Sequence, residues 1–246
     1  MTERKPGRGK KVPEPCWIGH FPALAGTSQL QPTSTARRGK GLKMNPQVHI
    51  RATEVLARGK ATTKKVTFDY KAHDGELVVN TREVYDRGDA VAVLPFDAAR
   101  RTVLLTRQFR LPAWLNGYRE PLIEACAGRL EGEAAETRIL SEAEEELGYR
   151  LHSLRKVFEL FSSPGILTEK VACYFATYSP HDKISEGGGL HEEGEHIEVL
   201  EQHLEEAFGL IEAGAILDAK TVALLQRAHL EMGKREASPI SQFRSS

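Results

Sequence analysis

The sequence predicts an α/β sandwich preceded by a small antiparallel β-sheet. Alternating, β-branched segments fill the first part of the chain after residue 47, as strands do. Further on, apolar runs of strand length alternate with segments of helical periodicity, and this order is typical of layered α/β domains. The length of 246 residues fits one domain, or one domain with a small appendage.

The charge of the chain is balanced overall but not along its length. The whole sequence has 34 Lys or Arg and 34 Asp or Glu. Residues 1–43 hold nine Lys or Arg and two Glu, so residues 44–246 carry a net charge of −7. An acidic body gives no sign of a surface that binds nucleic acid.

Residues 1–43 are rich in Gly, Pro, Ser, Thr, Lys and Arg, a composition that predicts a disordered basic arm. No apolar stretch is long enough for a secretory signal or a membrane span, so we expect a cytoplasmic protein without a membrane partner. The arm could be a transit peptide, or Met44 could be the natural start of the protein. The polar residues 233–246 predict a disordered tail.

Three strands are expected in the first region, 44–87. They are Val48–Leu56, Lys65–Tyr70 and Glu76–Val84, with Asp74-Gly75 as the turn signal between the last two. A sheet of this size rarely stands alone. We therefore expect it to pack against another surface.

The second region, 88–232, alternates strands with helices. Short apolar runs predict strands at 90–95, 102–107, 122–127, 151–161, 172–178 and 197–200. Helix-forming composition and helical periodicity predict helices at 133–147, 204–213 and 221–232. Trp114–Tyr118 is expected to be a loop, and residues 181–196, with the run Gly187–Gly189, a long mobile one.

Acidic side chains gather on one face of the expected helix Glu133–Leu147, which Gly148 is placed to end. At 3.6 residues per turn, Glu142, Glu145 and Glu146 point the same way. Carboxylate oxygens in such a cluster are ligands for a hard cation such as Mg²⁺. From the glutamates alone, a solvated acidic helix face is the favoured interpretation of the cluster.

Two arginines stand close together in Arg107-Gln-Phe-Arg110, directly after an expected strand. Such side chains can hold phosphate groups through bidentate hydrogen bonds. The alternative is an ordinary solvated strand end.

The segment from Gly128 to Tyr149 resembles the Nudix box. The matching positions are Gly128, Glu133, Glu142, Glu145, Glu146 and Gly148. Two departures are visible: the spacer from Gly128 to Glu133 is one residue shorter than usual, and Ser141 replaces the arginine before Glu142. Arg138, four residues before Glu142, is placed to supply a compensating charge.

The resemblance extends over residues 44–232, to the GDP-mannose and ADP-ribose pyrophosphatase branch of the Nudix hydrolases. It is carried by motifs in one order: Arg82-Glu-Val-Tyr-Asp-Arg87, Arg107-Gln-Phe-Arg110, Trp114 with Asn116-Gly117, Cys126-Ala-Gly128, Phe158-Glu-Leu160, Ser163-Pro-Gly165, Thr168-Glu169, Gly187–Gly189, Ile197-Glu-Val-Leu-Glu201, and Asp218 with Lys220-Thr221. It implies a Nudix-type α/β/α sandwich with a mixed central sheet in 88–232. It also implies that the sheet of 44–87 forms a homodimer.

Site residues follow from the same resemblance, position by position. The implied metal ligands, for Mg²⁺ or alternatively Mn²⁺, are Ala127, Glu142, Glu146 and Glu195. The implied catalytic residues are Glu195, Glu145 and Glu146. The implied substrate-binding residues are Arg82, Glu83, Arg110, Gly128, Glu169 and Lys220.

The implied activity is hydrolysis of the pyrophosphate bond in a nucleoside diphosphate sugar such as GDP-mannose, giving a nucleoside monophosphate and a sugar 1-phosphate. One alternative is an ADP-ribose pyrophosphatase. A second is a Nudix-fold sensor that binds a nucleotide sugar without cleaving it, and Ser141 and the shortened spacer motivate this hypothesis.

Overall fold

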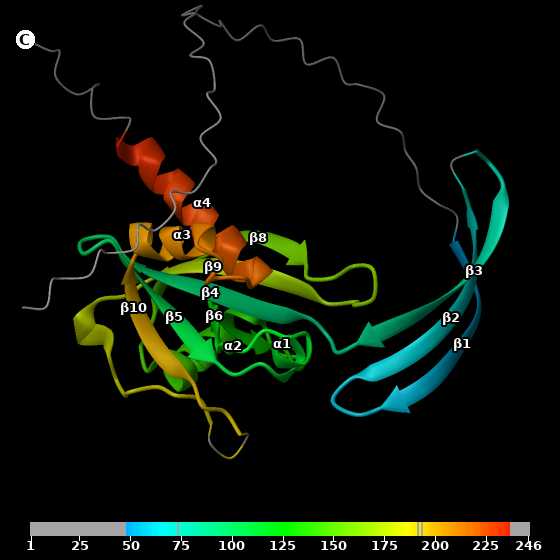
Figure 1. The fold of residues 1–246 in the computed structure, drawn as a ribbon, viewed down its shortest axis with the longest axis horizontal. Helices are drawn as coiled ribbons and strands as arrows, with labels where there is room; N and C mark the ends of the chain where they lie inside the picture. The colour runs from blue at the N-terminus through cyan, green and yellow to red at the C-terminus, as the bar shows by residue number, and fades with distance from the viewer. Residues whose placement is uncertain (1–47, 73, 191, 193, 237–246) are drawn as a thin grey trace, which may run out of the picture. The chain divides into compact units, whose positions relative to one another are not determined.

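The structure is a computed structural model that describes residues 48–72, 74–190, 192 and 194–236 (Figure 1). The chain divides into two units, Met1–Met44 and Asn45–Ser246, and the description below concerns the second. The predicted basic arm and residues 237–246 of the predicted tail lie outside the described residues. No helix in the described part of the chain is long and apolar enough to cross a membrane.

The first three strands form a separate antiparallel sheet in the order β1-β2-β3. Their bounds are β1 Val48–Arg58, β2 Thr62–Lys71 and β3 Leu77–Asp86. The turn between β2 and β3 lies at the expected place, where the Asp74 side chain accepts a hydrogen bond from the Glu76 N–H at 3.0 Å. The predicted small sheet is therefore confirmed, with strands slightly longer than expected.

The second sheet is mixed, because β4 pairs with β9 in parallel and every other strand pairing in it is antiparallel. Its main path is β10-β5-β4-β9-β8, with β6 on β5 and β7 on β4. The strands are β4 Ala90–Asp97, β5 Thr102–Gln108, β6 Leu122–Glu124, β7 Cys126–Arg129, β8 His152–Phe161, β9 Lys170–Thr177 and β10 Glu198–His203.

Helices cover both faces of this sheet (Figure 1). They are α1 Leu111–Leu115, α2 Ala135–Glu142, α3 Leu204–Glu212 and α4 Ala219–Glu236, with a π-helical turn at Ala143–Leu147 and a 3-10 turn at Pro180–Asp182.

Alternate residues of β4 point to opposite faces, as in any strand. Ala92 and Leu94 pack in the core under α3 and α4, whereas Val91 and Val93 pack with Ile139 under α2. This arrangement confirms the predicted α/β/α sandwich.

Three predictions of secondary structure, two of helix bounds and one of a loop, need correction. The helix expected to begin at Glu133 begins at Ala135, because Ala134 has an extended backbone and the Glu133 N–H bonds the Leu130 carbonyl in a turn. The first residues of the expected loop at 114–118 belong to α1, a single turn that Pro112 starts. Finally, α4 continues past the expected end at Met232 to Glu236.

Residues 184–189, here called the glycine strap, lie against the end of the π-helical turn. The Gly188 and Gly189 N–H groups donate to the Glu146 and Glu145 carbonyls at 2.9 and 3.1 Å. Gly187 has a φ of +67°, and a Cβ there would overlap the Glu146 carbonyl. These glycines therefore allow close backbone approach. The strap is a loop, as predicted, and its backbone is hydrogen-bonded to the π-helical turn. His191 and Glu193 of that predicted loop lie outside the described residues.

Candidate active site

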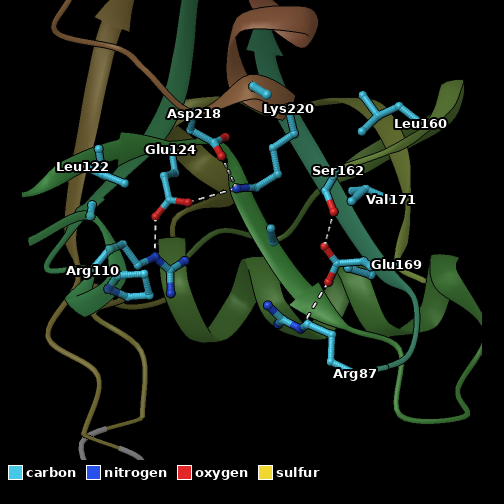
Figure 2. Close-up of a pocket in the computed structure, with 15 residues that line it drawn as sticks. Arg87, Arg110, Leu122, Glu124, Leu160, Ser162, Glu169, Val171, Asp218 and Lys220 are labelled. Atoms are coloured by element: carbon cyan, nitrogen blue, oxygen red, sulfur yellow. Dashed lines mark hydrogen bonds and ion pairs between the residues drawn. The ribbon is translucent and has the colours of Figure 1, made fainter. Parts of the chain in front are cut away.

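Two adjoining pockets lie at the ends of β6 and β7. The first, here called the carboxylate pocket, is lined by Lys60, Ala61, Tyr85, Arg87, Arg110, Ala127, Gly128, Arg129, Glu131, Arg138, Glu142, Glu145, Glu146, Leu190 and Glu195. The second, here called the lysine pocket and drawn in Figure 2, is lined by Arg87, Ala90, Arg110, Pro112, Ala113, Leu122, Glu124, Ala127, Leu160, Ser162, Glu169, Val171, Asp218, Ala219 and Lys220.

Arg87, Arg110 and Ala127 line both pockets, so the two are neighbours with a shared wall. Their cavity volumes are about 540 Å³ for the carboxylate pocket and 410 Å³ for the lysine pocket. Each volume is within the range of small-molecule sites, and one ligand can extend across both.

The helix α2 and the π-helical turn after it hold the glutamates of the carboxylate pocket. Glu142 and Glu146 are 6% and 3% exposed, so both carboxylates lie below the protein surface. One oxygen of Glu146 accepts a hydrogen bond from the Ala127 N–H on β7 at 3.3 Å. A π-helical turn often occurs at a functional site, and here it carries Glu145 and Glu146.

Gly128 is required by the position of the Glu142 carboxylate. A Cβ at residue 128 would overlap the Glu142 carboxylate group. The glycine that opens the Nudix-like pattern therefore makes room for an acidic side chain at the end of α2.

The departure at Ser141 has a local structural role. The Ser141 hydroxyl donates a hydrogen bond to the Glu145 carboxylate at 2.7 Å. Arg138 forms an ion pair with Glu142, as expected from their spacing. These two contacts supply a hydrogen bond and a positive charge beside the glutamates, in a sequence that has serine at the usual arginine position.

Burial and mutual repulsion leave the carboxylates poorly stabilised as anions. Burial raises the pKa of Glu146 to about 7, and the charges of Glu142 and Glu195 add to the increase. Burial also raises the pKa of Glu142, although the charge of Arg138 opposes this effect. A cation in the pocket would offset this unfavourable charge.

Glu195 faces the same pocket from the segment after the glycine strap. Its carboxylate accepts a hydrogen bond from the Leu190 N–H at 3.0 Å. The strap is bonded to the backbone carbonyls of Glu145 and Glu146, so Glu195 is connected to the helix that carries the other carboxylates.

The residues present suit a hard divalent cation, because all the side-chain donors are carboxylate oxygens. Among the described residues, however, no three Asp, Glu, His or Cys side chains converge closely enough to hold a metal ion as they stand. The Glu142 carboxylate is paired with Arg138 instead.

The lysine pocket contains two charged networks (Figure 2). In one, Glu124 contacts Arg110 at 2.6 Å and Lys220 at 2.9 Å, and Lys220 also contacts Asp218 at 3.0 Å. The other network has Glu169 at its centre.

Glu169 is 6% exposed and accepts a hydrogen bond from the Ser162 hydroxyl at 2.8 Å. It also contacts Arg87 at 3.1 Å. Carboxylates, ammonium and guanidinium groups thus alternate along the wall of the pocket, an arrangement that suits a ligand with many hydroxyl groups.

Most of the residues singled out from the sequence line one of these pockets. In the carboxylate pocket are Ala127, Gly128, Glu142, Glu145, Glu146, Glu195 and Arg110. In the lysine pocket are Arg110, Ala127, Glu169 and Lys220. Arg82 and Glu83 line neither pocket of their own chain; both are exposed on β3.

Four polar or charged residues of the lysine pocket were not assigned a role from the sequence: Arg87, Glu124, Ser162 and Asp218. Arg87 and Asp218 belong to stretches that resemble the family, so closer attention to charged residues in those stretches could have found them. Glu124 and Ser162 offered no local signal, because their partners are distant in sequence or lie across a turn.

Comparisons with known proteins cover both sheets. A family model described as the GDP-mannose pyrophosphatase NudK N-terminal domain matches residues 47–85, and the NUDIX domain model matches residues 86–227. A GDP-mannose pyrophosphatase of Cronobacter sakazakii is 43% identical over 190 residues, which are 77% of this chain and 97% of that protein.

A GDP-mannose pyrophosphatase of Escherichia coli is 41% identical over 191 residues, 76% of this chain and 99% of that protein. A crystal structure of an ADP compounds hydrolase has a TM-score of 0.58 at 22% identity, and the match covers 77% of this chain and 96% of that chain. At this identity, the structural likeness supports the fold.

Proposed function

This chain belongs to the NUDIX family, and we propose that it cleaves the pyrophosphate bond of a GDP-mannose-like nucleotide sugar with the help of a divalent cation. The family and its relatives make the chain a hydrolase that acts on pyrophosphate bonds. The proposed products are a nucleoside monophosphate and a sugar 1-phosphate. The identity to GDP-mannose pyrophosphatases over nearly their whole length supports the choice of substrate.

One observation carries the proposal: acidic side chains and arginines line the same pocket. Glu142, Glu145, Glu146 and Glu195 provide negative charge for a cation, whereas Arg87 and Arg110 lie at the border with the lysine pocket. A pyrophosphate between the arginines and a cation would have its charge compensated from both sides. The two ends of the substrate would then occupy the two pockets.

The cation would be held by the Ala127 backbone and by the carboxylates of Glu142, Glu146 and Glu195. Glu145 would support these ligands. Mg²⁺, or Mn²⁺ in its place, would supply positive charge that offsets the pyrophosphate and would make the attacking water more acidic.

In this proposal Glu195 orients the water and accepts its proton as the oxygen attacks phosphorus. The bond to the bridging oxygen breaks, and the bridging oxygen leaves with the other phosphate. Arg110 donates hydrogen bonds to the phosphate oxygens on which charge increases. Gly128 leaves room beside Glu142, while Glu169 and Lys220 bind the substrate from the lysine pocket.

We further propose that residues 44–87 form a dimerisation region and 88–232 the hydrolase domain. Several apolar side chains of β1 and β3 are exposed in the single chain, namely Val48, Ile50, Val55, Leu56, Leu77 and Val79. An apolar surface of this kind is typical of a protein–protein interface. A second copy would also explain how Arg82 and Glu83 reach substrate, since they would do so in the partner's site.

The purified protein is therefore expected to sediment at about twice the chain mass of 27.3 kDa. Ile50→Asp places a charge on the exposed sheet and should shift the protein to the monomer with reduced activity, because burying an unpaired charge is unfavourable. Leu230→Asp on α4 is the matched control, since Leu230 is also exposed. A wild-type protein that sediments as a monomer at micromolar concentration contradicts the dimer.

The activity is tested by incubating the protein with GDP-mannose, ADP-ribose and other nucleotide sugars, with and without Mg²⁺ or Mn²⁺, and separating the products chromatographically. We expect GMP and mannose 1-phosphate from GDP-mannose, and no product after chelation with EDTA. If the protein cleaves ADP-ribose faster than GDP-mannose, it is instead an ADP-ribose pyrophosphatase, the alternative considered above. Binding of a nucleotide sugar without release of a monophosphate at any cation concentration would contradict hydrolysis and favour a sensor.

We also propose that the protein works in the cytoplasm. Cys126 and Cys173 are buried free thiols, and free thiols are typical of reducing compartments.

A further inference from the structure

Glu124 is a buried carboxylate in the wall of the lysine pocket, and no step of the proposed reaction uses it. It lies at the end of β6 and is 4% exposed. One of its oxygens accepts a hydrogen bond from Arg110 Nε at 2.6 Å, and the other accepts one from Lys220 Nζ at 2.9 Å (Figure 2). A single side chain therefore bridges two cationic groups that line the pocket.

The three residues come from different parts of the fold, and Lys220 is 96 residues from Glu124 in the sequence. Arg110 follows β5, Glu124 ends β6, and Lys220 stands in the first turn of α4. The neighbouring backbone is fixed separately, because the Ala125 N–H donates to the buried Thr221 hydroxyl at 2.7 Å. The junction of β6 and α4 thus has a hydrogen bond that does not involve Glu124.

Stability alone is a weak reason for such a network. A buried ion pair is often no more stabilising than apolar side chains of similar volume, because burying the charges costs about as much as their attraction returns. The network has instead a geometric effect. It fixes the direction of two long cationic side chains that would otherwise have many rotamers.

Both cations keep hydrogen-bond donors for a ligand. Arg110 contacts Glu124 through Nε, and its guanidinium has four further N–H donors; its side chain is 41% exposed. Lys220 contacts Glu124 and Asp218, and its ammonium has a third donor. The bound partners determine where these remaining donors point.

We propose that Glu124 is a positioning residue that holds Arg110 and Lys220 together in the orientation that binds the nucleotide sugar. This inference rests on the proposed function and adds to it a residue that acts without touching the substrate. It also predicts that removing the carboxylate weakens substrate binding more than it slows the chemical step.

The protonation of Lys220 gives a second readout. Burial lowers the pKa of Lys220, but the charges of Glu124 and Asp218 outweigh burial and leave the pKa raised. Among the other groups that face it, Arg110 is positive, and burial raises the pKa of Cys173 to about 12 and that of Cys126 well above its ordinary value. Neither thiol can therefore replace the negative charge of Glu124.

Glu124→Gln should raise the KM for GDP-mannose at least about tenfold, with a much smaller change in kcat, because two charge-assisted hydrogen bonds are weakened. It should also move the alkaline limb of the pH profile of kcat/KM to lower pH by about one unit or more, as Lys220 loses its proton more readily. Both are measured by steady-state kinetics, in a pH series that extends above the ordinary lysine pKa of about 10.4, with thermal unfolding recorded in parallel.

The matched control is Glu159→Gln. Glu159 also bridges two lysines, Lys156 at 2.7 Å and Lys170 at 3.0 Å, but it lies on β8 and lines neither pocket. The Glu159→Gln variant should have the wild-type KM and pH profile. If it shifts KM and the pH profile as much as Glu124→Gln does, a general charge effect is responsible and the proposal is overturned.

Glu124→Asp provides a test that does not depend on the folding of Glu124→Gln. It keeps the charge but is one methylene shorter, so it cannot contact both cations; KM should rise by about threefold or more, since one charge-assisted bond is lost. A wild-type KM and pH profile in both position-124 variants would overturn the proposal while leaving the hydrolase intact.

Failure of the proposed function is distinguishable, because the wild type itself would then release no monophosphate. In that case the dissociation constant of GDP-mannose, measured by calorimetry, replaces KM as the readout. The same loss of affinity in the two variants supports the role of Glu124, and unchanged affinity or no binding to any of the proteins overturns it.

Discussion

Replacing Glu146 by glutamine is expected to lower turnover of GDP-mannose by at least about 100-fold, the scale typical of removing one preorganised electrostatic group from an active site. The amide keeps the shape of the side chain and can still accept the hydrogen bond from the Ala127 N–H. It loses the negative charge that the proposed site uses to hold a cation. Activity is measured by product release at saturating Mg²⁺, and cation affinity by calorimetry.

The fold should survive this change, because a neutral amide removes a buried negative charge that lies near Glu142 and Glu195. We therefore expect an unchanged or higher melting temperature in EDTA. Glu144→Gln on the same turn is the control: Glu144 is exposed, contacts Arg150, and lines neither pocket. Wild-type turnover in Glu146→Gln would reject the proposed site.

Gly128→Ala is expected to reduce activity by about tenfold or more with little loss of stability. The added methyl group would overlap the Glu142 side chain, which can turn away because it is a long, flexible group. Misplacing a catalytic group by about 1 Å can cost about 100-fold in rate. Initial rates and thermal unfolding of the same preparations would check both parts of this prediction.

Gly209→Ala serves as its control. Gly209 lies in α3, and a Cβ there meets no atom within 4 Å. This variant should keep full activity, and the alanine can even stabilise the helix. If Gly128→Ala has wild-type activity, Glu142 does not need its observed position and loses its proposed role.

The fold was largely predictable because its signals are local. Alternating and β-branched residues located the three strands of the first sheet, and Asp74-Gly75 located a turn that is present. The start of α2 was missed because Ala134 is a good helix former by composition yet has an extended backbone. The short helix α1 was missed because one turn of helix has too few residues to show a period.

The carboxylate pocket was more predictable than the lysine pocket for a similar reason. Glu142, Glu145 and Glu146 are neighbours on one helix, so their spacing alone brings them together. Glu124 and Lys220 are 96 residues apart and meet only when β6 and α4 are in place. The backbone contacts of the glycine strap were not predictable, because glycine serves both mobile loops and close backbone contacts, and composition does not distinguish the two.

The wall that the two pockets share limits how the enzyme could be re-engineered for other sugars. A change at Arg87, Arg110 or Ala127 alters both cavities at once, so selectivity and catalytic power would vary together. Leu160, Val171 and Ala219 line the lysine pocket alone. A library randomised at those three positions is the better starting point for directed evolution of new selectivity.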